Sequence, residues 1–192
     1  MQKLQTFLRA HATVRGFMAA LLVIGACTLV IRFALIPMYR NATGFLPFDA
    51  QPGLSPFSIG VQLGAFPIAD ARWVYLPFAV FDALSVLATA WVFALLWTWL
   101  FDRAPTRLFA FLTRGGFVLV PFYVLVFDLA GKVGFFRLVS SGRGDATAAL
   151  VDLCVWLHRF EYGFITLRND ATIAFLLVIA WTLIAPRFKR GA

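Results

Sequence analysis

Residues 117–139 read FVLVPFYVLVFDLAGKVGFFRLV, an apolar run that contains an aspartate and a lysine four positions apart, Asp128 and Lys132. Gly115–Gly116 precede the run, and Ser140–Gly142 follow it. About 20 consecutive, mainly apolar residues are long enough for a helix to cross a membrane. The sequence therefore predicts a membrane-spanning helix over residues 117–139, with two opposite charges inside it.

The same length criterion predicts three more spans, over residues 17–38, 74–101 and 165–186. The chain is 61% hydrophobic and 14% charged, whereas soluble domains have roughly 45–50% apolar and about 25% charged residues. Lipid must therefore cover much of the apolar surface. We expect an all-α fold, in which residues 1–192 form a single transmembrane helical domain, a bundle of four spans.

Residues 146–160 are harder to assign. Leu150, Leu153, Leu157 and Phe160 recur at helical spacing, but the segment also carries charged side chains, which are costly in hydrocarbon. We predict an amphipathic helix at the membrane interface that leads into the fourth span. The alternative is a fifth, distorted span.

The distribution of basic residues predicts the orientation, because Lys and Arg concentrate in cytoplasmic loops. Nine basic residues and one acid, Asp102, lie at the N-terminus, in the loop after the second span and at the C-terminus. The other side has six basic residues, balanced by six acids. We expect a multi-pass protein of the bacterial inner (cytoplasmic) membrane, with both termini in the cytoplasm.

The outer loop, residues 39–73, is unusually apolar for its length. Ser55 and Pro56 are typical of the N-cap and first position of a helix, and we expect a short helix that ends at Gly64. Such a loop is expected to lie on the bundle rim or to dock against another membrane subunit. Its candidate docking residues are the aromatic ones: Phe45, Phe48, Phe57, Phe66 and Trp73.

Four ionisable residues fall within the predicted spans: Arg32, Asp82, Asp128 and Lys132. With a rise of about 1.5 Å per residue, each lies roughly 9–16 Å below the outer end of its helix. A charge in hydrocarbon costs several kcal/mol unless it is paired, so we predict that the four converge into one neutral cluster. The cluster is either a structural ion-pair network, a substrate or proton site, or a partner-binding site.

The sequence predicts no catalytic residue, no metal site and no cofactor, although a bound lipid or pigment remains possible. The two cysteines and two histidines lack the spacing of metal sites, and nucleotide-binding and zinc-protease motifs are missing. His158 is a weak candidate ligand for a pigment or haem iron; a solvated histidine at the interface is the simpler interpretation. The basic residues flank apolar runs instead of forming one patch, which excludes nucleic acid as a partner.

Three short motifs resemble a group of small uncharacterised bacterial four-helix inner-membrane proteins. They are Gly-Phe-Leu-Pro-Phe-Asp at 44–49, Ala-Asp-Ala-Arg-Trp-Val-Tyr at 69–75, and Phe-Asp-Leu-Ala at 127–130. Members of that group have a Pro-Phe-Asp outer loop and an aspartate in each middle span, but carry Glu-Asn where this chain has Gly131-Lys132. The resemblance implies a bacterial inner-membrane protein and no particular activity.

Two functions follow as expectations. The first is a non-catalytic accessory or assembly subunit of a larger membrane complex, for example a respiratory or photosynthetic one, whose partners are membrane lipids and other integral membrane subunits. The alternative is a small transporter or lipid-handling membrane enzyme that uses the charge cluster.

Overall fold

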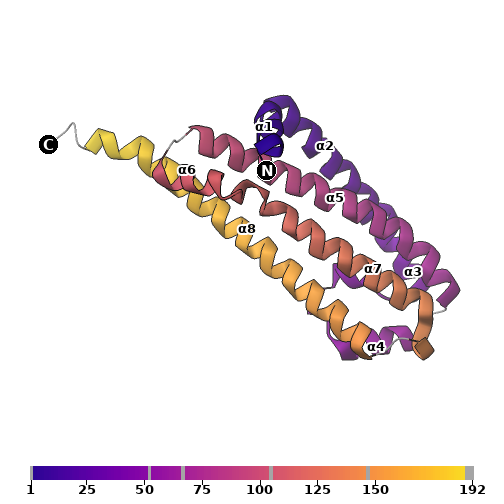
Figure 1. Ribbon diagram of the computed structural model, residues 1–192. Coiled ribbons are helices and arrows are strands. Elements are labelled where there is room, and N and C mark those ends of the chain that lie inside the picture. The colour runs from indigo at the N-terminus through magenta and orange to yellow at the C-terminus, as the bar shows by residue number, and fades with distance from the viewer. Residues whose placement is uncertain (1, 52, 66–67, 104–105, 146–147, 189–192) are drawn as a thin grey trace.

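The computed structural model describes residues 2–51, 53–65, 68–103, 106–145 and 148–188. In these ranges the chain forms helices joined by short turns, with no strand (Figure 1). Four helical rods in this part of the chain are long and apolar enough to cross a membrane. The prediction of an all-α bundle with four candidate spans is confirmed.

The helices follow one another along the chain with short connections. The N-terminal half holds α1 (Gln2–His11), α2 (Val14–Val30), the π-helical segment η1 (Ile31–Leu35), α3 (Ile36–Thr43), the 3₁₀ turn η2 (Phe48–Ala50) and α4 (Pro56–Ala65). The C-terminal half holds α5 (Ile68–Arg103), α6 (Arg107–Arg114), the 3₁₀ turn η3 (Phe117–Leu119), α7 (Pro121–Asp145) and α8 (Ala148–Phe188).

Consecutive long helices pack side by side: α2 on α5, α5 on α7, and α7 on α8. The short helices α1 and α6 lie at one end of the bundle and α4 at the other (Figure 1). The helix α4 packs against α7 and α8. The short connection between α7 and α8 favours the packing of these two helices as antiparallel neighbours.

The first span is longer than predicted because the helix continues through Pro37. Proline has no N–H to donate, and its ring clashes with the preceding turn. The π-helical segment η1 comes directly before it, where Ile36 N–H bonds to Ile31 O and the turn is wider. The rod then ends at Gly44, whose φ of 79° is left-handed and whose N–H caps Arg40 O at 2.8 Å.

The predicted start of the outer-loop helix is confirmed. The Ser55 hydroxyl accepts a hydrogen bond from Ser58 N–H at 3.1 Å, and the Ser58 hydroxyl accepts one from Ser55 N–H at 3.0 Å. These reciprocal bonds satisfy amides that a helix start leaves free. Pro56 is the first residue of α4, which ends at Ala65, one residue beyond the predicted Gly64.

The division of the last segment into two helices is wrong. Residues 148–188 form one unbroken helix, α8, instead of an interfacial helix over 146–160 followed by a span over 165–186. Between these two predicted pieces the chain has no proline, and Gly163 alone does not end a helix. The charged residues that suggested a break are accommodated in part by burial, since His158 and Arg168 face the bundle interior.

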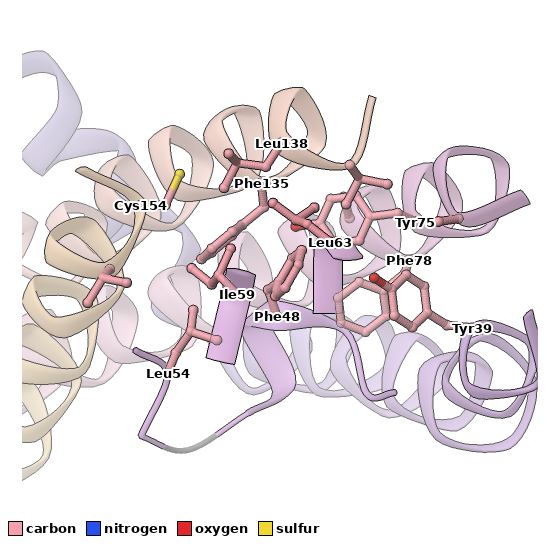
Figure 2. Packing of buried hydrophobic residues seen from close by; sticks show 14 of the residues in the cluster. Tyr39, Phe48, Leu54, Ile59, Leu63, Tyr75, Phe78, Phe135, Leu138 and Cys154 are labelled. Atoms are coloured by element: carbon pink, nitrogen blue, oxygen red, sulfur yellow. The ribbon is translucent and has the colours of Figure 1, made fainter. Parts of the chain in front are cut away.

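Two apolar cores lie at opposite ends of the bundle. At the α4 end, the outer loop folds back onto the helices, and Phe48 lies among Ile59, Leu63 and Phe135 (Figure 2). At the α1 end, Leu8 and Phe109 anchor the two short helices on a cluster that includes Trp97 and Phe175. Burying a large apolar side chain contributes roughly 1.5–3 kcal/mol, so each core fixes a loop or short helix onto the spans.

Candidate functional site

The charge cluster centres on the ammonium group of Lys132 in α7. Its Nζ forms salt bridges with Asp82 Oδ2 of α5 at 2.6 Å and with Asp128 one turn earlier in α7. A third carboxylate, Asp49 Oδ2 from the turn η2, lies 3.8 Å from the same Nζ. These four residues, Asp49, Asp82, Asp128 and Lys132, are called the Lys132 cluster below.

Asp49 was not among the predicted members of the cluster. The neighbouring Phe48 is fully buried and stacks on Phe135 with ring centroids 5.3 Å apart. This anchor draws η2 into the end of the bundle, where Tyr75 donates a hydrogen bond to Asp49 Oδ2 at 2.8 Å. The only signal in the sequence is that Asp49 is one of two acids, with Asp70, in the apolar loop of residues 39–73.

Arg32, by contrast, lies outside the cluster, and its predicted membership is wrong. Arg32 is exposed and shares a helix face with Leu29 and Phe33, which are 59% and 72% exposed. The buried positions of this rod, Cys27, Leu35 and Tyr39, lie on another face. Within the described ranges, Arg32 forms no ion pair. A long arginine on such a face can extend its guanidinium toward the membrane surface.

The cluster is therefore not neutral. With every group ionised, it holds three carboxylates and one ammonium, whereas the sequence predicted two charges of each sign. Asp128 Oδ2 is buried and has no hydrogen-bond partner among the described residues. A buried, uncompensated charge is costly, and a carboxyl group in such a site takes up a proton to remove it.

Burial also affects the loop member of the cluster. Desolvation raises the pKa of Asp49 to about 6 from its ordinary value of 3.8. Lys132 and the Tyr75 hydroxyl act in the opposite direction, while the nearby carboxylates of Asp82 and Asp128 reinforce the rise. Asp49 thus exchanges its proton closer to neutral pH than an exposed aspartate does.

Access to the cluster is uneven. The side chains of Lys132, Asp128 and Asp49 are at most 7% exposed, whereas that of Asp82 is 27% exposed. Two half-buried hydroxyl residues, Ser85 and Thr89, follow Asp82 on α5. The Thr89 hydroxyl donates a hydrogen bond to Ser85 O at 2.8 Å. Asp82 is therefore the least enclosed member of the cluster.

His158 is buried, not solvated as the sequence predicted. Its Nε2 lies 3.3 Å from Gln51 O in the outer loop, and its Nδ1 lies 3.9 Å from Glu161 Oε2. It also lines a pocket of about 380 Å³ together with Ser55 and Tyr162. Glu161 lies near enough to Asp128 and Lys132 for their charges to act on it.

Arg168 lies near the start of the predicted fourth span, and it is 7% exposed and lies inside the bundle. Its guanidinium carbon lies 4.1 Å from the ring centroid of Phe93 in α5, and its nitrogens contact Asn169 Oδ1 at 3.3 Å. The aromatic face and the amide oxygen compensate part of the cost of burying this charge.

The aromatic residues of the outer loop differ in how exposed they are. Phe48 is part of the core, and Phe45 packs against that core, so neither forms an open docking surface. Phe57 and Trp73 are 82% and 68% exposed. Phe66 lies outside the described residues. The predicted docking surface is therefore reduced to Phe57 and Trp73.

Within the part of the chain that the structure describes, no group of three His, Cys, Asp or Glu residues is arranged to hold a metal ion. In the Lys132 cluster, the ammonium group itself lies among the three carboxylates. Comparison with known proteins gives no further guide, because the chain matches no protein-family model, no curated protein and no solved structure.

Proposed function

We propose that this chain is a small multi-pass membrane transporter that binds and releases protons at the Lys132 cluster. The observation that carries the proposal is the excess of carboxylates: three surround one ammonium group, and one buried carboxylate oxygen, Asp128 Oδ2, has no partner in the described ranges. A purely structural ion-pair network would be expected to balance its charges.

Two further features support proton exchange. Asp82 is the least enclosed member of the cluster, and the pocket lined by His158 lies beside Glu161, whose Oε2 is 3.9 Å from His158 Nδ1. Ionisable residues inside membrane spans commonly form proton relays or substrate pathways. Movement of a proton on or off one carboxyl group would change the net charge around Lys132, and such a change can bias the packing of α5 against α7.

The orientation belongs to the same proposal. The helices α1 and α6, which lie at one end of the bundle (Figure 1), carry exposed basic side chains, and basic loops face the cytoplasm. We place this end in the cytoplasm of a bacterium, with the chain in its inner membrane. The Lys132 cluster then lies in the outer half of the bundle.

Infrared difference spectroscopy tests the proton-binding step on the purified full chain. The wild-type protein should show the C=O stretch of a buried protonated carboxyl group. Asp49→Asn, Asp82→Asn or Asp128→Asn should remove or shift that band, whereas Asp152→Asn, at an exposed position on α8, should leave it unchanged. If the wild-type protein shows no such band at any pH at which it stays folded, the proposal is wrong.

Transport itself can be followed in phospholipid vesicles that enclose a pH-sensitive dye. Vesicles with the wild-type protein should dissipate an imposed pH gradient faster than vesicles with Asp128→Asn. Vesicles with Asp152→Asn are the matched control and should behave like wild type. Equal rates for all three proteins would contradict transport.

The second candidate is an accessory or assembly subunit of a larger membrane complex. It is favoured by Phe57 and Trp73, two large aromatic side chains that stay exposed at the α4 end. Extraction in a mild detergent should then give a larger assembly that Phe57→Ala with Trp73→Ala dissociates. Phe33→Ala, at an exposed position on the first rod, is the control and should leave the assembly intact.

A further inference from the structure

A second concave site lies at the opposite end of the bundle from the Lys132 cluster. It is a pocket of about 490 Å³ between the start of α2 and the last turns of α5. Its walls are mainly apolar: Val14 and Phe17 come from α2, and Leu96 and Trp99 come from α5. Pockets that bind small molecules have volumes of roughly 300–1,000 Å³ and similar linings.

Arg103 supplies the charge at this pocket. Its guanidinium carbon lies 5.0 Å from the ring centroid of Trp99, and Arg103 is exposed. The acid next to it in the sequence, Asp102, pairs instead with Arg9 at 3.2 Å. No carboxylate in the described ranges pairs with Arg103. An apolar pocket therefore carries one positive charge that the protein does not neutralise.

The surroundings of the pocket strengthen this positive charge. The helices α1 and α6 bury apolar anchors, Leu8 and Phe109, in the bundle. The exposed Arg107 and Arg114 of α6 lie at the same end of the bundle but outside the pocket lining. The start of α2 also faces the pocket with its N-cap residue, Thr13, and the N-terminus of a helix carries a partial positive charge.

We propose that this pocket binds one anionic phospholipid, with its phosphate against Arg103 and an acyl chain along the wall formed by Val14, Phe17 and Leu96. Charge complementarity selects the anionic headgroup, and the apolar walls select the chain. Tryptophan is enriched at the headgroup level of membranes, where its ring is apolar and its N–H is polar, and Trp99 lies beside Arg103. The site rests on the membrane location proposed above but not on proton exchange.

Native mass spectrometry of the detergent-solubilised full chain tests the site. The probes are phosphatidylglycerol and phosphatidylcholine with identical acyl chains. The wild-type protein should retain phosphatidylglycerol preferentially, and Arg103→Gln should weaken that retention about fivefold, since a basic residue near an anionic surface contributes on the order of 1 kcal/mol. Arg107→Gln removes a charge at the same end outside the pocket lining and should retain the lipid as wild type does.

A second variant tests the groove without changing its charge. Val14 is 78% exposed, so Val14→Trp should fill the pocket without disturbing the core and should reduce the binding of both lipids. Equal retention of the two lipids by the wild-type protein would overturn the proposal, and so would equal losses in Arg103→Gln and Arg107→Gln, which indicate diffuse attraction. The infrared band of the Lys132 cluster should be unchanged in these variants. The lipid site can therefore be wrong while proton binding is correct, and the reverse.

Discussion

Lys132 is the residue on which the charge balance of the bundle interior depends. It is 5% exposed and is the cation shared by Asp49, Asp82 and Asp128. Placing an ammonium group in an apolar interior costs several kcal/mol, and the adjacent carboxylates compensate for that cost. Removing the ammonium group alone would leave three carboxyl groups that can stay buried only by taking up protons.

Lys132→Met is therefore expected to lower the free energy of unfolding by about 3–5 kcal/mol, as is typical when one partner of a buried ion pair is removed. Denaturant unfolding in detergent measures this loss. Lys3→Met, at an exposed position, should change stability little. Adding Asp128→Asn to Lys132→Met should recover part of the loss, and an additive double variant would show that Asp128 and Lys132 are not coupled.

Asp49 gives the stability a dependence on pH. Its pKa is raised to about 6 in the folded protein from 3.8, so between these values the folded state binds more protons than the unfolded state. Stability must then fall as pH rises from about 4 to 6, by up to about 3 kcal/mol, and level off above that range. Asp49→Asn should flatten this part of the stability curve, as measured by unfolding at a series of pH values. Asp152→Asn should leave the curve unchanged, and an equal slope in Asp49→Asn and wild type would exclude Asp49 as its source.

Part of the site could be predicted from residue spacing alone. Asp128 and Lys132 lie four residues apart, so a helix must place them on one face, and Asp82 lies at a similar depth. Arg32 lies at the predicted depth, but it is on the exposed helix face that carries Leu29 and Phe33. Asp49 could not be predicted, since its position depends on where the buried Phe48 anchors the loop.

At the scale of whole helices, the contact between α7 and α8 depends on one small residue. A Cβ atom added at Gly134 would lie 2.5 Å from Cys154 Sγ, closer than atoms can approach. Both Cys154 and the neighbouring Phe135 are almost fully buried. The absence of a side chain at Gly134 thus sets the distance between the two helices near the core at the α4 end.

Gly134→Ala is accordingly expected to destabilise the protein by about 1–3 kcal/mol, the usual cost of overpacking. Thermal unfolding measures the effect. Gly163→Ala is a matched control, because nothing lies within 4 Å of its added Cβ, and it should be neutral or slightly stabilising. Combining Gly134→Ala with Cys154→Ala should restore stability by removing the sulfur. Failure of this rescue would place the constraint elsewhere than at Sγ.

The four spans were predicted correctly from the length of their apolar runs, but the ends of the helices were predicted less accurately. The first span was predicted to end at residue 38, yet the π-helical segment η1 carries the helix past Pro37 to Thr43. The charged residues of segment 146–160 indicated an interfacial helix separate from the fourth span, yet α8 is continuous and buries His158 and Arg168. Contacts between helices determine where these helices begin and end, and such contacts cannot be inferred from the local sequence.

For the molecule as a whole, the two ends of the bundle differ in chemistry. The α4 end is closed by an apolar loop that inserts Phe48 and Asp49, while the α1 end carries amphipathic helices with exposed basic residues. Such an asymmetry is what orients a protein in a bacterial membrane. It also separates the two proposed sites, because the Lys132 cluster lies toward one end and the Arg103 pocket lies at the other.

The orientation can be measured with two single cysteines. Ala10 on α1 and Gly60 on α4 are exposed, and a side chain added at Gly60 meets no atom within 4 Å. The native Cys27 and Cys154 are buried, so they provide a weakly reactive background. In intact bacterial cells, a membrane-impermeant maleimide should label Gly60→Cys at once and Ala10→Cys only after the membrane is permeabilised, because basic ends stay in the cytoplasm. Labelling of Ala10→Cys in intact cells would reverse the proposed orientation, and with it the assignment of the Lys132 cluster to the outer half of the membrane.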